Sequence, residues 1–85
     1  KVLQYSLDVC EGSQFYSQGL YTQTIAKLTP ITELALTSDN RSADMYSVIG
    51  LANKVLSRVY VAQGRYELSF SAAQTSYQAY DLANN

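Results

Sequence analysis

Two basic side chains, Lys54 and Arg58, form the pair in this sequence that is best suited to binding a ligand. They stand four positions apart in a stretch with helical periodicity, and residues with that spacing lie on one face of a helix. An ammonium and a guanidinium group together can hold a carboxylate through charge-assisted hydrogen bonds. The pair is therefore a candidate contact for an acidic ligand, and an ordinary solvated pair is the alternative.

Catalytic chemistry has few residues to draw on. The sequence contains no histidine, which is the commonest general base and metal ligand, and a single cysteine, Cys10. Asp8 and Glu11 can share a helix face, but their spacing identifies no partners for acid–base catalysis, so we interpret them as a solvated face. The four glycines stand apart and form no phosphate-binding loop. We expect no enzymatic activity, no metal site and no cofactor.

Composition predicts one small folded domain over residues 1–85. Hydrophobic residues make up 47% of the chain and charged residues 15%, a balance too apolar for a disordered segment. The net charge is −1 and the charges are scattered, whereas nucleic acids and anionic membranes select clustered Lys and Arg. We therefore expect a protein or peptide partner, with no nucleic acid and no membrane.

The lone Cys10 cannot form a disulfide within the chain and stands beside apolar residues in a helical stretch. We interpret it as a core thiol, because free cysteines behave as small buried hydrophobes. The lack of a disulfide framework favours a reducing intracellular compartment such as the cytoplasm. The sequence also lacks an apolar run long enough to predict a membrane-spanning helix.

One seven-residue phrase occurs twice, 45 positions apart. Residues 15–21 read FYSQGLY and residues 60–66 read YVAQGRY, so that an aromatic residue, Gln-Gly and a final Tyr recur. Each copy lies between two helical stretches, and its glycine can supply the left-handed residue that ends a helix. The pattern predicts two helical hairpins with the same kind of turn.

The first hairpin is expected over residues 2–37. Apolar residues recur at helical spacing up to about residue 17, and Gly12 within this stretch indicates that something packs closely against it. The second helix begins near residue 21 and contains Pro30, which is costly in a helix interior. We expect this helix either to kink at the proline or to stop near Leu28 and restart, and in both cases to end near Thr37.

A polar linker over residues 38–42 divides this hairpin from a second one over residues 43–83. The strongest helical periodicity in the chain runs from 43 to about 63 and is carried by Met45, Val48, Ile49, Ala52, Val55, Leu56, Val59 and Tyr60. The last helix, from about 66 to 83, carries Tyr66, Phe70, Ala73, Tyr77 and Tyr80 on one face. Its small residues lie in adjacent rows, where a neighbouring helix can approach closely; they are Ser69, Ala72, Ala73 and Ser76. The fold class is predicted to be all-α.

The second hairpin resembles a tetratricopeptide repeat. Leu56, Ser57 and Tyr60 occupy the Leu-Gly-Tyr places of the first helix in that family, and Gly64 and Tyr66 occupy its turn. Further places are taken by Ser69, Ala73 and Ser76 in the second helix, and, in the first hairpin, by Gly12, Phe15, Gly19 and Tyr21. The chain departs from the family pattern in its 45-residue interval, which exceeds the usual period of about 34 residues, and in lacking the closing proline.

The resemblance implies a right-handed stack of helical hairpins whose concave groove binds a peptide or partner helix. It places Lys54 and Arg58 on the surface that lines this groove, with Leu51 and Val61 as apolar contacts that continue it. It also implies that tyrosines 60 and 66 fill the angle between helices. Repeat stacks normally need three or more units, so we expect a larger repeat array, a dimer or a partner chain. The expected role is that of an interaction module or scaffold.

A closed four-helix bundle that serves oligomerisation or complex assembly is the alternative architecture, because it uses the same amphipathic helices. The two architectures differ in their helix contacts. A stack of hairpins places the third helix beside both the first and the second, with consecutive hairpins offset in one direction. A bundle closes all four helices around one core.

Overall fold

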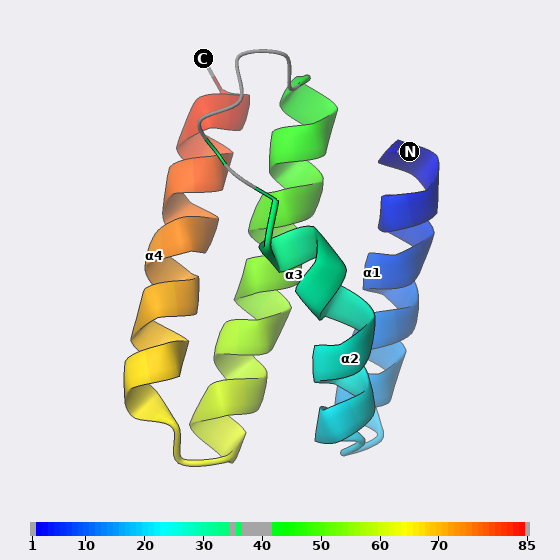
Figure 1. Ribbon diagram of the computed structural model, residues 1–85, viewed down its shortest axis with the longest axis vertical. Helices are drawn as coiled ribbons and strands as arrows, with labels where there is room; N and C mark the ends of the chain where they lie inside the picture. Colours follow the sequence, from blue (N-terminus) through cyan, green and yellow to red (C-terminus); the bar gives the residue numbers. More distant parts are fainter. Residues whose placement is uncertain (1, 35, 37–41, 85) are drawn as a thin grey trace.

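The computed structural model describes residues 2–34, 36 and 42–84, and within these ranges the chain forms four helices and no strand. The helices are α1 (Val2–Ser17), α2 (Tyr21–Thr32), α3 (Ala43–Ala62) and α4 (Tyr66–Ala83). They form two antiparallel hairpins, α1 with α2 and α3 with α4 (Figure 1). The predicted all-α class and the two hairpins are confirmed.

Both hairpin turns are Schellman motifs. In the first, the Leu20 N–H donates to the Phe15 carbonyl at 2.9 Å and the Gly19 N–H donates to the Tyr16 carbonyl at 3.0 Å. The second turn repeats both hydrogen bonds 45 positions later, at 2.8 and 3.0 Å. The glycine of each turn has a positive φ, 77° at position 19 and 75° at Gly64, a conformation that costs glycine least. The repeated phrase therefore encodes one turn used twice, as predicted.

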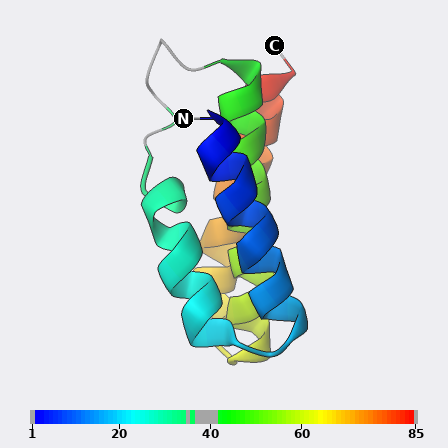
Figure 2. The same ribbon diagram turned by 90° about the vertical axis from the view of Figure 1, so that its right-hand side faces the viewer.

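Helix α3 lies at the centre of the arrangement. It packs against α1 and α2 on one side and against α4 on the other (Figures 1 and 2). Among the described residues, no Cα of α4 comes within 8 Å of a Cα of α1 or α2. The four helices therefore do not close around one core as the bundle alternative requires, and the second hairpin is instead offset to one side of the first.

The core lies where α3 meets the first hairpin. Its buried members are Val9, Leu28, Ile31, Ile49, Ala52, Val55, Leu56 and Ala79. The periodic apolar positions predicted for the third helix all belong to the buried or half-buried part of the chain. The close contact predicted at Gly12 is also confirmed, because a Cβ atom built there would lie 2.8 Å from the Cγ of Leu28.

Small residues form the contact between α3 and α4. The buried side of α4 consists of Ser69, Ala72, Ser76 and Ala79. The Ser76 hydroxyl donates to the Gly50 carbonyl at 2.8 Å, and the Ser57 hydroxyl donates to the Ser69 carbonyl at 3.0 Å. Small side chains let the two backbones approach, and the hydroxyls then bond across the contact. The predicted close approach is confirmed at Ser69, Ala72 and Ser76, whereas Ala73, which was predicted with them, is exposed.

Helix α2 continues through Pro30 and ends at Thr32. The prediction that it ends near Thr37 was wrong, and Thr37 itself lies outside the described residues. A proline removes one N–H donor and crowds the preceding turn, which weakens this helix close to its end. Leu34 and Leu36 still pack against the core, as the apolar pattern after the proline indicates. Most of the polar linker is likewise outside the described part of the chain.

Two burial predictions were wrong. Cys10 is exposed, because α1 turns Val9 and Gly12 inward and no described helix covers its opposite face. Tyr66 is 68% exposed and does not fill the angle between helices, because α4 packs on α3 through its serines and alanines. Tyr60, in contrast, packs against the core as expected.

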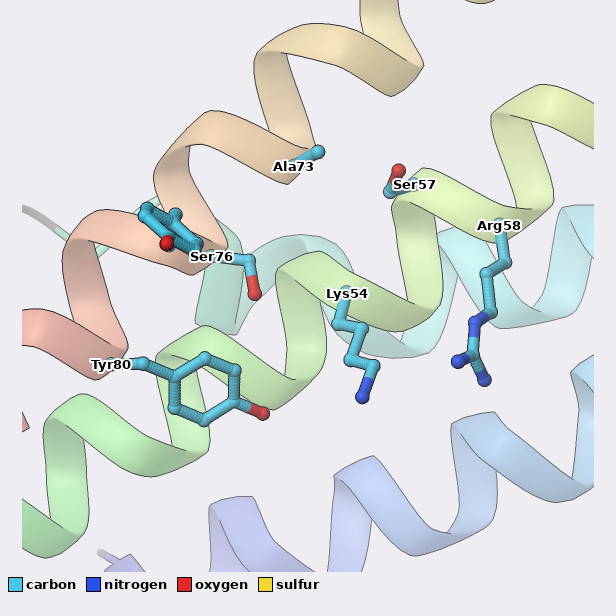
Figure 3. Close-up of a pocket in the computed structure, with 7 residues that line it drawn as sticks. Lys54, Ser57, Arg58, Ala73, Ser76 and Tyr80 are labelled. Carbon is cyan, nitrogen blue, oxygen red and sulfur yellow. The ribbon is translucent and has the colours of Figure 1, made fainter.

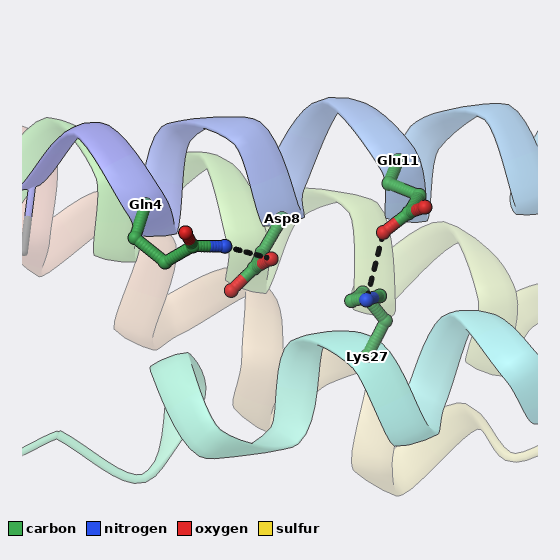
Figure 4. A network of polar contacts seen from close by, with 4 residues as sticks. All are labelled: Gln4, Asp8, Glu11 and Lys27. Atoms are coloured by element: carbon green, nitrogen blue, oxygen red, sulfur yellow. Dashed lines mark hydrogen bonds and ion pairs between the residues drawn. The ribbon is translucent and has the colours of Figure 1, made fainter.

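A polar network joins the exposed edges of α1 and α2 (Figure 4). The Lys27 amine lies 2.7 Å from the Glu11 carboxylate, and the Gln4 amide donates to Asp8 at 3.0 Å. The hydrogen bond and the charge of Glu11 raise the pKa of Lys27 above its usual value of 10.5. The two acidic residues of α1 thus lie at the solvent-facing edge of the first hairpin.

Candidate protein-interaction groove

A hollow of about 350 Å³ opens between α3 and α4 (Figure 3). It is lined by Lys54, Ser57, Arg58, Ala73, Ser76, Tyr77 and Tyr80. The first three residues come from α3 and the other four from α4, so both helices of the second hairpin build it. We refer to this surface as the α3–α4 groove.

The basic pair forms the α3 wall of the groove. Lys54 and Arg58 extend from the same side of α3, one helical turn apart (Figure 3), and both are exposed. Within the described part of the chain, neither side chain has a carboxylate within 4.0 Å, in contrast to the paired Lys27. The two positive charges at the edge of the groove therefore have no counter-charge within salt-bridge distance among the described residues.

The floor of the groove is fixed by contacts between the two helices. The hydroxyls of Ser57 and Ser76 are already engaged across the helix contact. The Tyr80 ring lies over Gly50, where a built Cβ would be 3.1 Å from the ring carbons. Burial raises the pKa of the Tyr80 phenol above its usual value of 10.0, so this side chain is neutral at physiological pH. The floor is closely packed and uncharged, and the charged side chains of the groove are Lys54 and Arg58.

The four residues predicted to bind a partner share one exposed face of α3. Leu51 and Val61 are 41% and 51% exposed and stand on the same side of the helix as Lys54 and Arg58. Only the two basic residues line the groove. The structure therefore brings the basic pair together with α4, and it leaves the two apolar residues farther along the exposed surface of α3.

The α4 wall was not predicted as part of a site. Sequence reasoning placed its aromatic residues on one face without separating that face from the buried one, and the structure turns the row outward. Tyr66, Phe70 and Tyr77 are 68%, 66% and 83% exposed. The signal that could have identified this arrangement is the neighbouring row of serines and alanines, because a helix cannot bury both rows against one partner. Of these three exposed aromatic residues, only Tyr77 lines the groove beside the basic pair.

The comparisons with known proteins place the chain in no family. No protein-family model matches it, and neither a curated protein nor a solved structure was found to be significantly similar. None of the described helices combines the length and the apolar character needed to cross a membrane.

The internal repeat gives the groove a structural counterpart within the same chain. Besides sharing a turn, the two hairpins start their second helices alike: Leu20 has φ and ψ of −91° and 70°, and Arg65 has −93° and 72°. Residues 45 positions apart therefore occupy corresponding places. By this correspondence Lys54, Ala73 and Ser76 of the groove match Val9, Leu28 and Ile31 of the first hairpin.

The corresponding surface of the first hairpin is covered by a helix. Val9, Leu28 and Ile31 are at most 2% exposed, because they form one cluster with the buried face of α3. Within the described residues, no helix occupies the same position on the second hairpin. The groove is thus the place where one more helix would pack if the arrangement of α3 on the first hairpin were repeated.

Proposed function

We propose that this protein is a non-enzymatic interaction module that binds a helix or peptide of a partner protein in the α3–α4 groove. The observation that carries this proposal is the correspondence between the groove and the surface of the first hairpin that α3 covers. One copy of that surface already accepts a helix within the chain. The second copy follows the same turn geometry, and no described helix covers it.

The lining of the groove indicates which ligand it prefers. Tyr77 and Ala73 offer apolar area on α4, and exposed aromatic residues are frequent anchors at protein interfaces. On the opposite wall, Lys54 and Arg58 offer charge-assisted hydrogen bonds to carboxylates of a ligand. The best ligand is an amphipathic helix with acidic residues along one border of its apolar stripe. The likeness to tetratricopeptide repeats agrees with this role, because such modules act through grooves of this kind.

The proposal is tested by selection from a displayed library of helical peptides that share an apolar stripe and vary elsewhere. We expect the selected peptides to be acidic beside the stripe. Their affinity, measured by fluorescence anisotropy, should fall roughly tenfold in Lys54→Glu, equivalent to about 1.4 kcal/mol. Ala73→Lys, which fills the groove, should lose binding entirely.

The matched control is Leu68→Lys, which changes a residue of α4 that is 48% exposed and does not line the groove. This variant should bind the selected peptides as the parent chain does. Circular dichroism confirms that all three variants remain helical. Peptides that bind the Ala73→Lys variant as well as the parent chain would show that the groove is not the binding site.

A further inference from the structure

Helix α1 has an apolar face that no described helix covers. Leu3 is 74% exposed, Leu7 is 57% exposed, and Cys10 is also exposed. The three residues follow one another at spacings of four and three, so they form one stripe along the outer side of α1. This stripe lies on the face of α1 opposite its buried residues Val9 and Gly12.

The 45-residue correspondence identifies what this stripe matches. Leu3, Leu7 and Cys10 correspond to Val48, Ala52 and Val55 of α3. In α3 these positions face the first hairpin: Ala52 and Val55 belong to the buried core, and Val48 packs against it. Helix α1 therefore carries apolar side chains at the positions that α3 uses for docking, and in α1 they face solvent.

The α1 stripe and the α3–α4 groove differ in charge from the two surfaces that meet where α3 packs on the first hairpin. In the covered pair, the relevant positions are apolar on both sides, as Val9 and Leu56 illustrate. Their counterparts are Lys54 in the groove and Glu11 on α1. Helix α1 contains two acidic residues and no basic one, and Lys27 of α2 already pairs with one of them, Glu11, whereas the groove contains two basic residues and no acidic one. On α1, Asp8 thus remains without a basic partner among the described residues, and its charge is opposite in sign to that of the groove.

We propose that the groove is occupied by α1 of a second copy of this chain. Each copy then docks its first hairpin onto the second hairpin of its neighbour in the way that α3 docks onto α1 and α2 within one copy. This inference rests on the proposed function, because it names the partner helix for the same groove. The contact joins two different surfaces, so a dimer leaves one copy of each surface free, and further copies add to it as the concentration rises.

Substitutions at two exposed positions test the two surfaces separately. Leu7→Lys places a positive charge on the α1 stripe, opposite the basic pair, and Ala73→Lys fills the groove. In sedimentation velocity experiments, the parent chain should form larger species as its concentration rises. Each variant alone should remain monomeric, with its association weakened by more than tenfold. Leu68→Lys, a charge introduced on neither surface, should associate as the parent chain does.

Mixing the two variants gives the deciding result. The groove of the Leu7→Lys chain and the α1 stripe of the Ala73→Lys chain are both intact, so an equimolar mixture should form a dimer that cannot extend. A parent chain that stays monomeric, or a mixture that stays monomeric although the parent chain associates, would overturn the head-to-tail contact. The Leu7→Lys monomer also tests the groove separately. If it binds the selected peptides while the parent chain never associates, the inference fails and the proposed function stands.

Discussion

Replacing Gly12 with alanine tests the closest helix contact in the fold. A Cβ atom at this position would lie 2.8 Å from both Cγ and Cδ2 of Leu28 and 3.1 Å from Cδ1. Leu28 is fully buried, so its side chain has no solvent-filled space into which it can turn. The added methyl group must therefore push α1 and α2 apart or force Leu28 out of its preferred rotamer.

Two opposing effects set the size of the change. Overpacking of a filled core costs about 1–3 kcal/mol, while exchanging glycine for alanine inside a helix gains about 1 kcal/mol. The net expectation is a loss of about 0–2 kcal/mol in the free energy of unfolding. In a Leu28→Ala background the atoms that obstruct the methyl group are gone. There the same substitution should stabilise the protein by about 1 kcal/mol, because only the helix-propensity gain remains.

Urea unfolding of the four proteins of this double-mutant cycle measures the reversal of sign. Leu28→Ala alone costs about 2–5 kcal/mol, so all four unfolding curves should be recorded with the same concentration of a stabilising osmolyte. Gly50→Ala is the control, because its neighbour is Tyr80, and its effect should be the same with and without Leu28. If Gly12→Ala changes stability equally in both backgrounds, Leu28 is not what requires a glycine at position 12.

Two further predictions concern the turns and the polar network. Gly19→Ala and Gly64→Ala should each lower the free energy of unfolding, measured with urea, by about 1–2 kcal/mol. The two losses should be nearly equal, because both positions have positive φ and no atom within 4 Å of a built Cβ. Clearly unequal losses would contradict the shared turn. Glu11→Gln should lower the pKa of Lys27 toward 10.5 in an NMR titration. Because folding raises this pKa, the ion pair favours the folded state below pH 10.5 and stops doing so as the pH rises through the raised value; an unchanged pKa would contradict the assigned cause.

Features that depend on local chemistry could be predicted from the sequence. The glycines of the repeated phrase place both turns, because few other residues adopt a left-handed backbone there. Ser42 begins α3 by accepting a hydrogen bond from the Met45 N–H at 3.1 Å, which is the usual contribution of a serine at a helix start. The bounds of α1, α3 and α4 follow from such signals together with helical periodicity.

Features that depend on which apolar face is covered could not be predicted in the same way. Helix α1 carries apolar residues on two sides, with Val9 and Tyr5 facing the core and Leu7 and Cys10 facing solvent. Periodicity identifies both stripes and does not say which of them meets another helix. In α4 the difficulty is greater, because the large aromatic residues are exposed and the small residues, such as Ser76, are buried.

Only the part of the site that depends on a single helix could be predicted from the sequence. Lys54 and Arg58 were selected by their spacing and charge, which are properties of one helix. Tyr77 and Tyr80 join them only because α4 packs closely against α3, and that packing depends on small residues whose role emerges in three dimensions. Leu51 and Val61 share the face of the basic pair but do not line the groove, which lies between this face and α4.

The difference between the two corresponding surfaces bears on how the groove is used. On the first hairpin, Leu28 and Ile31 are sealed beneath α3, and exposing such residues costs several kcal/mol, so this contact is as permanent as the fold. On the second hairpin their places are taken by Ala73 and Ser76, and a lysine stands where the first hairpin has a valine. Smaller and more polar residues give less hydrophobic stabilisation, which allows the surface to remain open in water. Under the proposed function, the same property would make binding in the groove reversible. The same kind of turn thus builds a hairpin with a fixed internal contact and, with a few substitutions, a hairpin whose corresponding surface we propose to be suited to reversible association.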